Sequence, residues 1–194
     1  MSGPTRLHHV AFATRDVEAT YDFYARRLGM KLVHTENHLA GKGWFRHFFF
    51  HMGGGEHIGF FAFEGVGERD GYRTDISTGV GLPVWVNHLA FNVDGVEALA
   101  AMRQRCVDNG VELLMEQDHG WCDSIYMVDP NGIMVEFTTT TDASKFDQSE
   151  EEALRLLRLE PGEFTPDERK DESSGVRVNR EAMARAEAAK RSSR

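Results

Sequence analysis

Two stretches of the chain repeat the same order of apolar and polar positions. Each has a short apolar strand pattern, an amphipathic helix pattern, a glycine and a further strand, as LHHVAFATRDVEATYDFYARRLGMKL and as VNHLAFNVDGVEALAAMRQRCVDNGVEL. The apolar spacing predicts helices over about residues 17–28 and 96–109, and Gly29 and Gly110 follow as left-handed caps. An internal repeat of this kind indicates two copies of one supersecondary unit.

Further strand patterns complete each copy. They are RHFFFHM and EHIGFFAF in the first copy, and DSIYMV and GIMVEFTT in the second, with turns at residues 53–55 and at DPNG, residues 129–132. The sequence therefore predicts an α+β fold of two βαβββ modules, at about residues 6–64 and 86–141. The glycine-rich connector between them, residues 65–85, is long enough either to close over a site as a lid or to reach a partner subunit.

Strand alternation predicts which side chains lie opposite the helices. In LHHVAF, Val10 is a natural packing partner of the helix, so His9 faces the other way, and this parity alone selects His9 over His8. The same reasoning for VNHLAF and IMVEF turns His88 and Glu136 into the cleft. A lone strand histidine is usually a packed or exposed residue, but matched histidines with a glutamate between apolar neighbours are costly to place without a charge partner. Two imidazoles and one carboxylate with open positions suit Fe(II), and also accommodate Mn, Co, Ni or Zn.

The composition changes near residue 141. The chain has 194 residues and is 41% hydrophobic, enough for one domain with an appendage. Residues 142–194 carry 13 acidic and 11 basic side chains among 53, so this segment cannot build a core of its own. We expect a charged C-terminal arm, partly helical or disordered, with an amphipathic stretch at 149–159 and a basic, alanine-rich stretch at 179–190. Such an arm would dock on the domain or on a neighbouring subunit.

Charge and cysteine usage narrow the class of protein. A net charge of −9 gives no basic footprint for nucleic acid. No apolar run approaches the roughly 20 residues that span a membrane, and the first residues do not have the build of a signal peptide. Cys106 and Cys122 form no CxxC motif and no disulfide framework, so both are expected to be ordinary thiols of a reducing compartment. These features indicate a cytoplasmic protein.

Three segments, HVAFATRDVEATYDFYARRLGM, NHLAFNV and SIYMVDPNGIMVEF, resemble the vicinal oxygen chelate superfamily. This superfamily includes glyoxalase I, fosfomycin-resistance proteins, bleomycin-binding proteins and type I extradiol dioxygenases, and the resemblance covers residues 6–141. It implies that the two modules form an incomplete barrel around a divalent metal, which a substrate chelates through two neighbouring oxygens. It also suggests a homodimer.

Beyond the three ligands, the residues of this chain are most similar to those of the extradiol dioxygenases. Glyoxalase-like sites have a fourth ligand, Glu or Gln, where this chain has Gly59. Extradiol enzymes have a catalytic histidine two residues earlier, here His57. They also have a tyrosine ten residues before the ligand glutamate, here Tyr126 before Glu136, and a histidine upstream of it, here His119. The chain departs from that pattern in having one pair of modules, where many such enzymes have two, and in a spacing from His119 to Tyr126 about two residues short.

The resemblance assigns roles to these residues. His57 would transfer protons as a neutral imidazole, while Tyr126 and His119 would hydrogen-bond the substrate oxygens. Three aromatic residues are candidates for lining an aryl pocket: Phe45, Phe48 and Trp121. Four further histidines fit no pattern and are expected at the surface or at the rim of the pocket: His34, His38, His47 and His51.

Three functions remain open. The first is an Fe(II)-dependent extradiol dioxygenase that acts on a catechol-like aromatic with O₂. The second is a glyoxalase-like lyase or isomerase, or a thiol transferase, with a non-redox divalent metal; a further ligand or activity with Ni, Mn or Zn would favour it. The third is a non-catalytic small-molecule binding protein, but such members usually lack the metal triad that this chain has.

Overall fold

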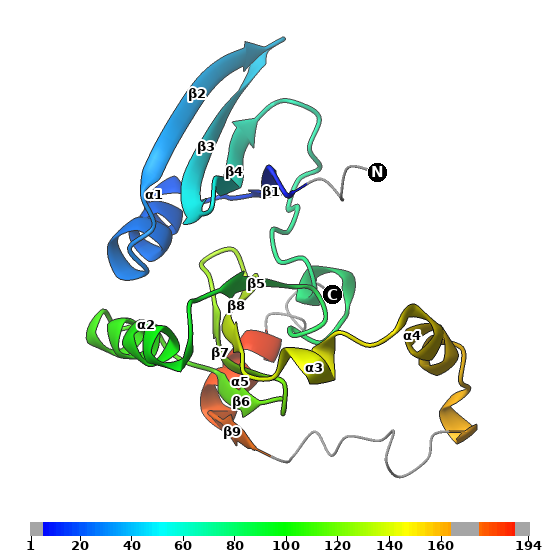
Figure 1. The fold of residues 1–194 in the computed structure, drawn as a ribbon. Coiled ribbons are helices and arrows are strands. Elements are labelled where there is room, and N and C mark those ends of the chain that lie inside the picture. The colour runs from blue at the N-terminus through cyan, green and yellow to red at the C-terminus, as the bar shows by residue number, and fades with distance from the viewer. Residues whose placement is uncertain (1–5, 164–174, 189–194) are drawn as a thin grey trace.

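The structure, a computed structural model, describes residues 6–163 and 175–188 and contains two βαβββ modules (Figure 1). This confirms the predicted fold class. The elements of the first module are β1 (His9–Ala13), α1 (Val17–Tyr21), the π-helical turn η1 (Asp22–Arg27), β2 (Leu32–Ala40), β3 (Gly43–Gly53) and β4 (Glu56–Glu64).

The second module follows the connector, which holds a short 3₁₀ turn, η2 (Thr78–Val80). Its elements are β5 (His88–Asn92), α2 (Val96–Asp108), β6 (Met115–Asp118), β7 (Cys122–Val128) and β8 (Met134–Thr140). The arm adds α3 (Ala143–Phe146), α4 (Glu150–Leu157), η3 (Pro161–Glu163), β9 (Val176–Val178) and α5 (Arg180–Ala188).

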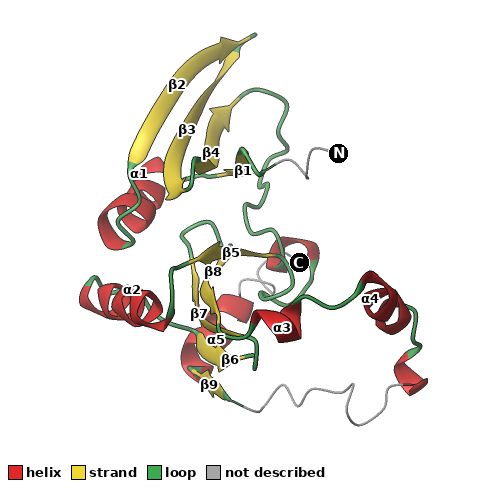
Figure 2. Ribbon diagram, viewed as in Figure 1, coloured by secondary structure: helices red, strands yellow, loops and turns green. Residues whose placement is uncertain are grey.

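Each module forms its own sheet, with the same internal order of strands (Figure 2). The first sheet runs β1-β4-β3-β2 and the second runs β5-β8-β7-β6-β9. In both sheets the first strand pairs in parallel with the last strand of its module, and the other pairs are antiparallel. The two repeats are therefore structurally equivalent, and β1 and β5 occupy matching edge positions.

The first predicted helix has the expected extent, but its second half is π-helical. Asp16 caps its start by accepting from the N–H of Ala19 at 2.9 Å, and the N–H of Leu28 donates five residues back to the carbonyl of Phe23 at 3.0 Å. Gly29 ends the helix at a φ of 83°. A side chain there would also collide with the guanidinium of Arg105, which donates to the carbonyl of Arg27 at 2.9 Å.

One hydrophobic core joins the helix-facing sides of both modules. The strand residues that alternate with the predicted ligands belong to this core or pack against it, as strand alternation predicts. They are Val10, Phe12, Leu89, Phe91, Val135 and Phe137. Phe48, expected in an aryl pocket, is also in this core with 2% of its surface exposed. That expectation was wrong because Phe48 lies opposite Phe60 and shares the helix side of the sheet with it.

Polar contacts fix the two modules against each other inside this core. The hydroxyl of Tyr24, which is fully buried, donates to Asp129 Oδ2 at 3.0 Å. The amide nitrogen of Asn131 donates to Thr20 Oγ1 at 3.2 Å. The predicted turn at residues 129–132 therefore packs on the first helix, and burial raises the pKa of Asp129 above its ordinary range.

The arm returns to the second module. β9 extends the second sheet by pairing with β6, and α5 places Ala182 against Val84, Tyr126 and Met134 in a second buried cluster. This cluster lies on the sheet face opposite α2. No helix in the described part of the chain is long and apolar enough to cross a membrane.

Candidate metal centre

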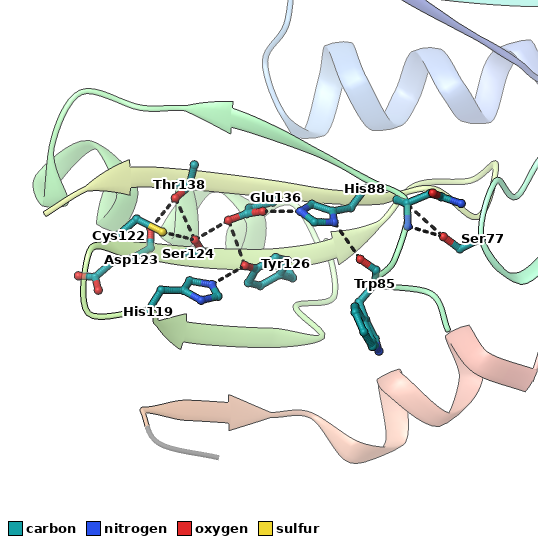
Figure 3. Close-up of polar contacts among 11 residues, drawn as sticks. Ser77, Trp85, His88, His119, Cys122, Asp123, Ser124, Tyr126, Glu136 and Thr138 are labelled. Atoms are coloured by element: carbon teal, nitrogen blue, oxygen red, sulfur yellow. Dashed lines mark hydrogen bonds and ion pairs between the residues drawn. The ribbon is translucent and has the colours of Figure 1, made fainter. Parts of the chain in front are cut away.

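Glu136 lies at the centre of a polar network on the face of the second sheet opposite α2 (Figure 3). It is on β8, and 5% of its surface is exposed. From the neighbouring strand β7, Ser124 Oγ donates to Glu136 Oε1 at 2.6 Å and the Tyr126 hydroxyl donates to the same oxygen at 3.0 Å. Burial would raise the pKa of Glu136, but the hydrogen bonds from His88, Ser124 and Tyr126 outweigh burial and lower it.

His88 faces the other carboxylate oxygen. Its Nε2 lies 3.1 Å from Glu136 Oε2, and its Nδ1 lies 2.8 Å from the carbonyl oxygen of Trp85. Because a carbonyl only accepts, Nδ1 carries the proton, and in the neutral ring Nε2 presents a lone pair to Glu136. Two acceptors this close need a cation between them, either a proton or a metal ion. The hydrogen bond with Glu136 accordingly raises the pKa of His88.

This donor set fits a divalent metal. An imidazole whose second nitrogen is fixed by a backbone carbonyl is the usual form of a metal-binding histidine, and the carboxylate beside it is held by hydrogen bonds of its own. His88 and Glu136 would hold the ion through Nε2 and Oε2, with Trp85, Ser124 and Tyr126 orienting them.

Tyr126 links Glu136 to His119. His119 Nε2 lies 2.8 Å from the Tyr126 hydroxyl, which donates to Glu136 and therefore accepts from His119. Burial, followed by the charge of Glu136, raises the pKa of Tyr126 well above its ordinary value. The phenol therefore keeps its proton at neutral pH. Two of the three residues predicted to be catalytic thus lie beside one predicted ligand.

Cys122 is a neighbour of this network that sequence reasoning did not select. The ligand atoms of His119, Cys122 and Glu136 all lie within 4.8 Å of one another, and among the residues described no other group of three does. The thiol of Cys122 is buried. Strand parity is the available signal, because Cys122 shares its face of β7 with Tyr126, but the lack of a CxxC motif favours an ordinary thiol.

His9 lies on the first sheet and does not join the network. Its ring contacts are with His8, His47 and Phe49, all in the first module. Its ligand atoms do not lie within 4.8 Å of those of both His88 and Glu136. The single chain therefore brings together two of the three predicted ligands. The shared core uses the helix-facing side of each sheet, so the two ligand-bearing faces stay outside it.

His57 accompanies His9 rather than Tyr126. The two histidines are directly opposite each other on β1 and β4, and the ring of His57 also lies near those of His8 and His51. The same face of the first sheet carries His47 and Phe49, which pack around Gly59.

The remaining candidates lie around these two faces. On β2, His34 and His38 flank Glu36, with ring nitrogens 2.6 Å and 2.7 Å from its carboxylate. Phe45 stacks on His38 with ring centroids 4.7 Å apart. The ring of Trp121 lies between those of His119 and Phe146 of the arm, with centroid distances of 5.8 Å and 4.5 Å. Trp121 is therefore beside the Glu136 network.

Comparison with known proteins assigns the family. The model of the Glyoxalase/Bleomycin resistance protein/Dioxygenase superfamily matches residues 6–137. The chain belongs to this superfamily. No functionally curated protein matches it.

Solved structures share the fold at low sequence identity. A glyoxylase/bleomycin resistance protein/dioxygenase domain from Frankia sp. is 20% identical, with a TM-score of 0.53, and the match covers 71% of this chain and 99% of that chain. A variant of the fosfomycin resistance protein FosX from Listeria monocytogenes, complexed with Mn(II) and 1S,2S-dihydroxypropylphosphonic acid, is also 20% identical, with a TM-score of 0.52 and coverage of 76% and 99%. A protein from Alicyclobacillus acidocaldarius is 17% identical, with a TM-score of 0.50 and coverage of 76% and 100%.

Proposed function

We propose that this chain is a divalent-metal-dependent enzyme of the superfamily, and that two copies of the chain share each metal site. The main support for a bound metal is the contact between His88 Nε2 and Glu136 Oε2, which are 3.1 Å apart, while His88 Nδ1 hydrogen-bonds to the carbonyl oxygen of Trp85. In this proposal His9 of a second copy completes the site. A twofold axis would make the exchange reciprocal and give two identical sites per homodimer.

A shared site would also include His57. Because His57 is paired with His9 across β1 and β4, a copy that supplies His9 would supply His57 with it. Ligands and proton-transfer groups that are separated in one chain would then meet: His9 and His57 from one copy, and His88, Glu136 and Tyr126 from the other.

For the reaction we propose ring cleavage of a catechol-like aromatic, with Fe(II) as the metal and O₂ as co-substrate. When bound, the metal would supply charge stabilisation and a template for two adjacent substrate oxygens. The pair formed by His119 and Tyr126 supports this reaction, because it places a protonated phenol beside Glu136. That phenol can donate to a substrate oxygen, and His57 can take the proton that a catechol loses.

The test is anaerobic reconstitution with Fe(II), followed by O₂ uptake and visible absorbance with a panel of catechols. We expect one O₂ consumed per ring opened and a yellow product, with His57→Ala and Tyr126→Phe slowed by about 10²-fold or more. His34→Ala is a matched control, because His34 is an exposed histidine of the first sheet that contacts Glu36. Tight metal binding without O₂ uptake would refute the redox reaction and leave the metal site standing.

One observation favours a second candidate, a non-redox lyase, isomerase or thiol transferase. Cys122 contributes a sulfur to the group that it forms with His119 and Glu136, and a sulfur ligand suits Zn better than a catalytic Fe(II). Activity with Zn, Mn, Ni or Co in the absence of O₂ would support this candidate. A Cys122→Ser variant with unchanged metal preference would count against it.

A further inference from the structure

His47 carries the one unsatisfied buried polar side-chain atom among the residues that the structure describes. Its Nε2 is buried and has no hydrogen-bond partner. A buried polar atom without a partner is destabilising, commonly by about 1–3 kcal/mol, and such atoms are rare in native proteins. The atom therefore calls for an explanation beyond packing.

The ring of His47 is held firmly by two phenylalanines. It stacks on Phe61 with centroids 3.7 Å apart and planes at 14°, and it lies 4.0 Å from Phe49. Side chains clamped in this way are fixed in orientation, which suits a group that must present one atom in a set direction. Nothing in these ring contacts satisfies the nitrogen.

Gly59 provides the space into which Nε2 points. A Cβ built on Gly59 would lie 3.0 Å from His47 Nε2 and 2.9 Å from a ring carbon of Phe49. Residue 59 has an extended backbone on β4, so no left-handed φ requires a glycine at this position. The missing side chain instead makes room for the imidazole. Gly59 pairs with Ala11 on β1, two residues from His9, and the rings of His9 and His47 are 6.3 Å apart.

We propose that His47 is a further protein ligand of the metal, reaching it across Gly59 on the same side of the sheet as His9. A bound ion would satisfy the unpaired nitrogen, and the imidazole would occupy the space that a side chain at position 59 would fill. This assignment rests on the proposed function, since the ion is the one shared by His9, His88 and Glu136.

The test counts coordinated imidazoles by pulsed EPR on the full-length protein loaded with Cu(II), and measures Zn(II) affinity by competition. We expect three imidazoles in the wild type and two in His47→Leu, with Zn(II) affinity reduced at least about 10-fold. His38→Leu is the matched control, because His38 also lies against a phenylalanine of the first sheet and contacts Glu36. It should leave the count and the affinity unchanged.

Thermal melting of the metal-free proteins separates this role from a structural one. Replacing an unsatisfied buried nitrogen by an apolar side chain should leave the metal-free melting temperature unchanged or raise it, while the rise on adding Zn(II) shrinks. An unchanged imidazole count and affinity in His47→Leu would overturn the inference. If His88→Ala also left both unchanged, the proposed metal site itself would be wrong, and a wild type that binds no Cu(II) would overturn both.

Discussion

Ser124→Ala is the most informative single change in the Glu136 network. Ser124 is 2% exposed and its hydroxyl donates to Glu136 Oε1 at 2.6 Å, so alanine removes one donor from a buried carboxylate and adds no clash. A hydrogen bond to a charged group contributes about 1.5–3 kcal/mol. We expect the free energy of unfolding of the metal-free protein to fall by that amount at neutral pH, which lowers Tm by about 3–12 °C.

The same change should weaken metal binding. Residues that orient a ligand typically account for about 10–100-fold in metal affinity, which corresponds to about 1.4–2.7 kcal/mol. Ser124 is one of the donors that lower the pKa of Glu136, so its loss raises that pKa. The stability difference between wild type and variant should be full above the ordinary glutamate pKa and shrink as the pH falls through the lowered pKa of Glu136 in the wild type.

Urea unfolding followed by circular dichroism measures the first effect, and competition for Zn(II) with a chromophoric chelator measures the second. Thr140→Val is the control, because it removes a hydroxyl from the exposed end of β8, the strand that carries Glu136. It should change the free energy of unfolding by less than about 0.5 kcal/mol. If Ser124→Ala behaved like Thr140→Val in both assays, Glu136 would not be the organised ligand described above.

Three further predictions concern the contact between the modules, the buried Cys106 and the pH dependence of His88. Tyr24→Phe removes the donor to the buried Asp129 between the modules and should lower the free energy of unfolding by about 1.5–3 kcal/mol in urea; an unchanged midpoint would contradict this. Burial raises the pKa of the Cys106 thiol to about 11, so it should react with a thiol reagent at neutral pH only after denaturation, and rapid labelling of the native protein would be inconsistent with its burial. Glu136 raises the pKa of His88, so in the metal-free protein their contact stabilises the fold most below about pH 6.5, and this stabilisation is lost as the pH rises through the raised pKa. Metal affinity should instead rise with pH, because the metal binds the neutral imidazole. A metal affinity that does not change between about pH 6 and 8 would argue against His88 as a ligand.

Sequence pattern predicted most of the fold because strand alternation is a direct consequence of backbone geometry. Val10 and Val135 pack in the helix-side core, and His9 and Glu136 lie on the opposite faces, as the pattern requires. Applied consistently, the same rule also separates Phe45 from Phe48, which are three residues apart and therefore on opposite faces. The π-helical turn was not predictable, because one extra residue in a turn leaves the apolar pattern almost unchanged.

The arrangement of the site could be predicted only in part. Parity says which face of its own sheet a residue occupies, but it does not say how two sheets are placed relative to each other. His88 and Glu136 meet because β5 and β8 are neighbours in one sheet, whereas His9 belongs to the other sheet. Cys122 and His47 lay on predictable faces, but their importance comes from contacts across strands, with Glu136 and with Gly59, that a linear pattern does not reveal.

The central claim is that two copies of the chain share each metal site. Its most direct test is metal binding by a mixture of two variants that each lack one ligand. His9→Ala and His88→Ala should each bind Zn(II) far more weakly than the wild type. If two copies share each site, refolding the two variants together should restore tight binding at about a quarter of the sites, because only mixed dimers contain one intact site. Tight binding that never returns on mixing would contradict a site shared between two copies of the chain.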